Sequence, residues 1–77
     1  MNPIRLSREE IKKLVYEISS LNQEQRALVR EFLERLAHSS DGHISPEELR
    51  KELSHQRAEH TISEIDAKAI TRAVFPS

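Results

Sequence analysis

The residues best suited to chemistry lie in one short segment, residues 37–49, with the sequence AHSSDGHISPEEL. The segment combines serine hydroxyls, an Asp41-Gly42 pair and carboxylates, and calcium binds oxygen ligands of these kinds, about six to eight per ion. The same residues also suit a simple joint between two helices. Asp-Gly is a common turn pair, and Ser45 with Glu48 forms a helix N-terminal capping box. We favour the joint, because the cap accounts for Ser45 and Glu48 and the turn accounts for Asp41 and Gly42.

Four capping motifs predict four helices around this segment. A capping box places a small polar residue at the N-cap and Glu or Gln three residues later. The chain offers four such pairs: Ser7 with Glu10, Asn22 with Gln25, Ser45 with Glu48, and Thr61 with Glu64. An apolar stripe with helical spacing follows each pair. We therefore expect helices over about residues 8–20, 23–38, 46–59 and 62–75.

The fold class expected from this pattern is all-α. With few aromatic residues and no alternating β-branched runs, the sequence predicts no strands. A chain of 77 residues is long enough for one small domain, spanning residues 1–77, whose core is thin. Short connections join the first helix to the second and the third to the fourth. We expect a small four-helix orthogonal bundle with the residue 37–49 loop in its middle.

A longer stretch, VREFLERLAHSSDGHISPEELRKEL at residues 29–53, resembles an EF-hand helix–loop–helix. That family has glycine at loop position six and a bidentate glutamate at position twelve, where this chain has Gly42 and Glu48. The resemblance extends more loosely to residue 75, where the last helix resembles the incoming helix of a second hand. It implies that calcium, if bound, would be held by Ser39, Asp41, the His43 carbonyl, Ser45 and Glu48. Position one is Ala37, so the first carboxylate is missing, and we expect no metal.

Other activities find little support in the sequence. There is no cysteine, which excludes thiolate chemistry, and we identify neither a nucleophile motif nor a glycine-rich phosphate loop. His55 and His60 are five residues apart, not at the four-residue spacing common in helical zinc sites. The 12 basic and 13 acidic residues are interspersed, and no apolar run is long enough to span a membrane. We expect a cytoplasmic, non-enzymatic protein without a cofactor or a membrane partner.

The leading functional hypothesis is a non-catalytic protein-interaction or regulatory module with an ion-free EF-hand-like loop. Tyr16, Val74 and Phe75 are apolar groups that the thin third helix cannot cover, so they are candidates for contact with a protein partner or a second copy. In the alternative, Phe75 closes the core of the monomer. A second alternative is a calcium-binding EF-hand protein.

A third alternative is a small helix-turn-helix DNA-binding protein or an antitoxin-like regulator. The last two helices are closely joined, and the last could present Lys68 and Arg72 to nucleic acid. Glu64 and Asp66 lie in the same helix and cancel that charge. Nucleic acid is therefore the less favoured partner.

Overall fold

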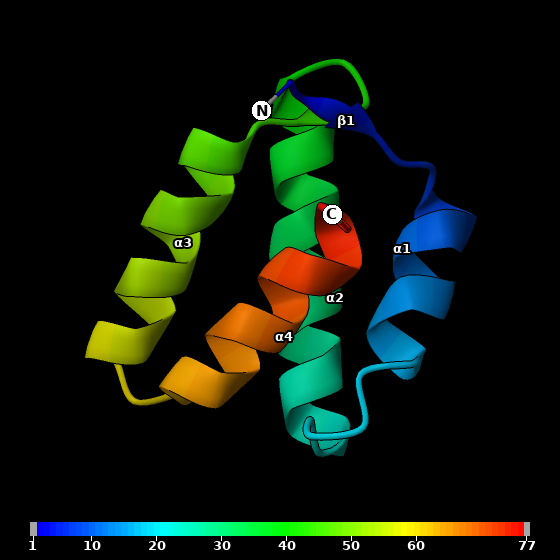
Figure 1. The fold of residues 1–77 in the computed structure, drawn as a ribbon. Coiled ribbons are helices and arrows are strands. Elements are labelled where there is room, and N and C mark those ends of the chain that lie inside the picture. The colour runs from blue at the N-terminus through cyan, green and yellow to red at the C-terminus, as the bar shows by residue number, and fades with distance from the viewer. Residues whose placement is uncertain (1, 77) are drawn as a thin grey trace.

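Four helices and one pair of two-residue strands form the computed structural model, which describes residues 2–76 (Figure 1). In chain order the elements are β1 (Ile4–Arg5), α1 (Arg8–Tyr16), α2 (Gln23–Ser39), β2 (His43–Ile44), α3 (Pro46–Ala58) and α4 (Glu64–Val74). The expected helical class and the number of helices are confirmed. The expectation of no strands is wrong, because a two-residue strand is too short to show alternation in the sequence.

The first two helices begin where their capping boxes predict. The Ser7 hydroxyl accepts the Glu10 amide at 3.2 Å, and the Glu10 carboxylate accepts the Ser7 amide at 3.0 Å. Asn22 and Gln25 make the same reciprocal pair at 2.8 and 2.9 Å. Each pair satisfies two backbone donors that the first turn of a helix leaves without partners.

The first helix is shorter than expected, ending at Tyr16 instead of residue 20. After it the chain makes two tight turns, in which the Ile18 amide donates to the Val15 carbonyl and the Leu21 amide to the Ile18 carbonyl, at 3.2 and 3.3 Å. These turns carry both Ile18 and Leu21 into the core. A continuous helix would have placed them on its stripe but could not have reversed the chain.

The third and fourth helices meet differently from the sequence prediction. The Thr61 amide donates to the Gln56 carbonyl and the His60 amide to the Arg57 carbonyl, at 3.1 and 3.0 Å. These are the two bonds of a Schellman C-cap, with His60 in its left-handed position at φ 62°. Thr61 thus belongs to the end of α3, and the predicted Thr61 capping box is wrong.

The N-cap of α4 is Ser63, two residues later than predicted. The Ser63 hydroxyl accepts the Asp66 amide at 3.1 Å, and the Asp66 carboxylate accepts the Ser63 amide at 3.2 Å. At the start of α3, the Ser45 hydroxyl accepts the Glu48 amide at 3.1 Å. The Glu48 side chain does not complete a reciprocal box there; it accepts from Ser40 instead, at 3.5 Å.

The two strands bring the start of the chain against the loop that precedes α3. β1 and β2 pair antiparallel, with Ile4 opposite Ile44 and Arg5 opposite His43. The Leu6 amide extends this pairing by donating to the Gly42 carbonyl at 3.1 Å. The side chain of Ile44, in β2, is fully buried. β1 therefore covers the backbone edge of the loop (Figure 1).

The core lies between the four helices. α1 and α3 each pack against both α2 and α4, and Figure 1 shows them on either side of these two helices. α2 buries Val29, Phe32, Leu33 and Ala37, and α4 buries Ala67, Ile70 and Val74 along with Asp66. α3 adds only Leu49, Leu53 and Gln56. Within residues 2–76, no helix combines the length and the apolar character needed to cross a membrane.

Candidate functional site

The loop after α2 is closed by main-chain hydrogen bonds. The Ala37 carbonyl accepts the Gly42 amide at 2.6 Å and the Ser40 amide at 3.2 Å, and the Ser40 carbonyl accepts the His43 amide at 3.1 Å. Asp41 and Gly42 both have left-handed backbone, with φ of 54° and 87°. Such a conformation is easy for glycine and tolerated by aspartate. The Asp41-Gly42 pair thus turns the chain directly after α2.

Side chains named by the calcium hypothesis take part in local hydrogen bonds. The Ser39 hydroxyl donates to the Leu36 carbonyl at 3.1 Å, and the Ser45 hydroxyl is the N-cap acceptor of α3. Asp41 is exposed, and the His43 backbone belongs to β2. Over the described residues, 2–76, no three His, Asp or Glu side chains gather as they would around a metal ion. The expectation that this loop holds no metal stays a prediction, with calcium binding as its alternative.

The three proposed partner-contact residues occupy different environments. Tyr16 is 75% exposed, and the guanidinium of Arg26 lies 5.4 Å from the centre of its ring. Val74 and Phe75 are buried, at 0% and 7% exposure. These two residues therefore close the core of the monomer and are not available to a partner.

The nucleic-acid candidates Lys68 and Arg72 are both exposed on α4. Glu64 is exposed one turn before Lys68, while Asp66 is buried. The outer face of α4 is thus more basic than the sequence suggested, because one of its acidic residues points inward. The positive charge is confined to two side chains, which is little for binding a phosphate backbone.

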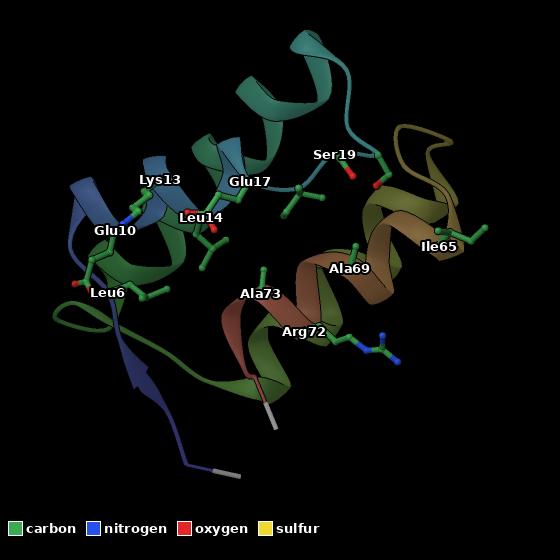
Figure 2. A pocket seen from close by; sticks show the side chains of 12 residues that line it. Leu6, Glu10, Lys13, Leu14, Glu17, Ser19, Ile65, Ala69, Arg72 and Ala73 are labelled. Carbon is green, nitrogen blue, oxygen red and sulfur yellow. The ribbon is translucent and has the colours of Figure 1, made fainter.

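A groove with a volume of about 730 Å³ lies between α1 and α4. Its apolar lining comes from both helices and from the connections beside them (Figure 2). These apolar residues are Leu6, Leu14, Ile18, Ile65, Ala69 and Ala73. The charged residues that line it are Glu10 and Lys13 on α1, Glu17 at the C-cap of α1, and Arg72 on α4. The groove therefore has an apolar floor between charged edges.

Ile65 is the most unusual residue of this groove. Its side chain is 73% exposed, although its spacing with other apolar residues of α4 suggested a core position. The buried side of α4 is set by Asp66, Ala67, Ile70 and Val74, so Ile65, Ala69 and Ala73 form a second stripe beside it. A helix with two adjacent apolar stripes can offer one of them to another molecule. That doubled stripe is the sequence signal that could have identified the groove.

Asp66 makes a hydrogen bond near the end of the groove at which Ile65 lies. Its carboxylate accepts the Ser20 hydroxyl at 2.7 Å, which joins the α1–α2 connection to the start of α4. Burial acts to raise the pKa of Asp66, but the hydrogen bonds from Ser20 and Ser63 outweigh it and hold the pKa below its ordinary value. The charged Asp66 therefore links the start of α4 to Ser20, a residue of the α1–α2 connection that lines the groove.

Comparisons with known proteins assign no family to this chain: no family model, no curated protein and no solved structure matches it.

Proposed function

We propose that this protein is a non-catalytic helical interaction module and that the α1–α4 groove binds an amphipathic helix. The observation that carries the proposal is the exposed Ile65 beside a groove floored by Leu14, Ile18 and two alanines. Large exposed apolar groups next to a hollow commonly mark a binding surface. A helix laying its apolar face into such a groove is a recurrent mode of recognition.

The charges at the groove favour a protein over a nucleic acid. Its edges carry carboxylates at Glu10 and Glu17 and cations at Lys13 and Arg72. Nucleic-acid binding depends on neutralising phosphates with several cations, and the two carboxylates would repel a phosphate backbone. A protein helix can present both signs of charge at its flanks, as interface rims do.

The proposal also covers the arrangement of the helices and the nature of the loop between α2 and α3. We describe the helices as an orthogonal bundle and the α2–loop–α3 unit as an ion-free, EF-hand-like joint. Support comes from the left-handed Gly42 at loop position six and from main-chain bonds that close the loop. The cysteine-free composition is compatible with action in the cytoplasm, which we propose as the location.

Site-specific photo-cross-linking in the source cell tests the interaction. A photoreactive phenylalanine analogue replaces Lys13 at the groove edge, and the matched control carries it at Lys51, an exposed position on α3. We expect a discrete cross-linked product at position 13 but not at position 51. Adding Ile65→Glu should remove it, since a carboxylate at that position is costly to bury in an apolar contact.

Calcium and chelator arms of the same experiment test the ion-free joint. The product should form equally in both arms, because the loop needs no cation to hold its shape. A product that requires calcium would contradict the ion-free part of the proposal. Equal products at positions 13 and 51, or none at position 13, would contradict the groove as the binding site.

A further inference from the structure

We infer that the occupant of the groove is α4 of a second copy of this chain, bound antiparallel about a two-fold axis. This inference rests on the proposed function and names the partner for the same groove. Two copies related by a two-fold axis present the same surface to each other, so that surface must complement itself. The α1–α4 groove does so in charge and in shape.

The two edges of the groove carry charges of opposite net sign. The α1 edge has two carboxylates, Glu10 and Glu17, against one ammonium, Lys13, whereas the α4 edge has Arg72. Beyond the groove lining, Lys68 is exposed one turn before Arg72 and Glu64 one turn before Lys68, so these two charges offset each other and Arg72 leaves the α4 side positive. One edge is thus net negative and the other net positive. A two-fold axis places the negative edge of each copy against the positive edge of the other.

The direction of the helices makes this match specific. Figure 2 shows Leu6 and Glu10 toward one end of the groove and Ser19 and Ile65 toward the other, with Glu17 and Ala73 between them. An antiparallel α4 from a second copy would bring its Ile65 toward Leu6 and its Arg72 toward Glu17. The exposed isoleucine of each copy would then lie on the apolar end of the other copy's groove.

Side-chain size along α4 favours the same arrangement. Ala69 and Ala73 line the groove in the two turns that follow Ile65. The distance between packed helices depends on the side chains at their contact, and small ones permit close approach. Two α4 helices crossing near Ala69 would each place Ile65 opposite Ala73, large against small. A partner of another sequence would need to supply both this shape and this charge pattern.

Solution mass over a concentration series tests the dimer. We expect light scattering on the full chain to give a mass rising toward twice the monomer value between micromolar and millimolar concentration. Ile65→Glu should keep the chain monomeric throughout, with unchanged circular dichroism because the side chain is exposed. Lys51→Glu, a charge reversal on α3 away from the groove, should dimerise like the wild type.

A charge-exchange experiment tests the orientation. Glu17→Lys and Arg72→Glu should each weaken self-association by about tenfold, because two ion pairs per dimer become repulsive. Mixing the two variants should restore association, since the mixed dimer regains opposite charges at both contacts. Recovery in the mixture supports the antiparallel two-fold arrangement. Dimers unaffected by these substitutions would overturn it.

The two proposals fail in distinguishable ways. A strictly monomeric wild type at millimolar concentration overturns the second-copy inference. If position 13 then still cross-links to a different protein, the interaction module stands with a foreign partner. If position 13 gives no specific product either, both proposals are wrong.

Discussion

At the scale of single residues, Asp66 is a buried carboxylate that joins the start of α4 to the α1–α2 connection. It is 6% exposed and accepts hydrogen bonds from the Ser20 hydroxyl and the Ser63 amide. A buried carboxylate is tolerated only when it is well hydrogen-bonded. Its pKa is held below the ordinary value of 3.8, because these bonds outweigh the opposing effect of burial. The charged form therefore stabilises the fold above that pH, and the stabilisation is lost as the pH falls through the lowered pKa.

We expect Ser20→Ala to lower the free energy of unfolding at neutral pH by about 1 kcal/mol, the typical net value of one hydrogen bond. The difference from the wild type should shrink at acid pH, as Asp66 becomes protonated in both proteins. Urea denaturation across the acid range measures it. Ser19→Ala is the matched control, because Ser19 is an exposed neighbour. A Ser20→Ala deficit that stays constant with pH would contradict the role given to Asp66.

At the scale of elements, the boundary between α3 and α4 shows how two caps compete for one short segment. Thr61 and Ser63 both have the residue type of an N-cap. The backbone bonds from His60 and Thr61 complete the C-cap of α3, which leaves Ser63 to start α4. Thr61 instead donates its hydroxyl within α3, to Gln56. The C-cap of the preceding helix therefore decides where the next helix begins.

Ser63→Ala should lower the free energy of unfolding by about 1 kcal/mol, the usual effect of removing an N-cap hydroxyl. Glu64→Ala should change it by less than about 0.5 kcal/mol, as expected of an exposed residue without a specific contact. Thermal and urea denaturation of both variants provide the comparison. A larger effect at Glu64 than at Ser63 would favour the Thr61 capping box over the observed one.

At the scale of the whole molecule, the first residues of the chain complete the fold. β1 pairs with β2 from the middle of the sequence, and Leu6 adds a hydrogen bond to Gly42. The backbone edge of the loop is thereby used within the monomer, so a partner is more easily accommodated at the helical groove than by strand pairing. In a domain this small, few contacts contribute to stability, and each long-range pairing matters.

Deleting residues 2–5 should lower the free energy of unfolding by about 2 kcal/mol, from lost strand hydrogen bonds at about 1 kcal/mol each. Exposure of part of the buried Ile44 contributes in the same direction. The control is the double variant Asn2→Ala, Pro3→Ala, which changes two exposed side chains before β1. Urea denaturation compares the two proteins. Equal stability of the deletion variant and the wild type would show that β1 contributes nothing.

The sequence by itself determined the helices, because capping and apolar periodicity act within a few residues. The Ser7 and Asn22 boxes and the four apolar stripes needed only local physics. Tertiary structure decided which segments far apart in the sequence pair and which side chains are buried. It paired β1 with β2 and buried Val74 and Phe75. It also left Ile65 exposed, because a helix with two apolar stripes can bury only the one its neighbours cover. The groove arises where α1 and α4 come together, a meeting that no short-range pattern specifies.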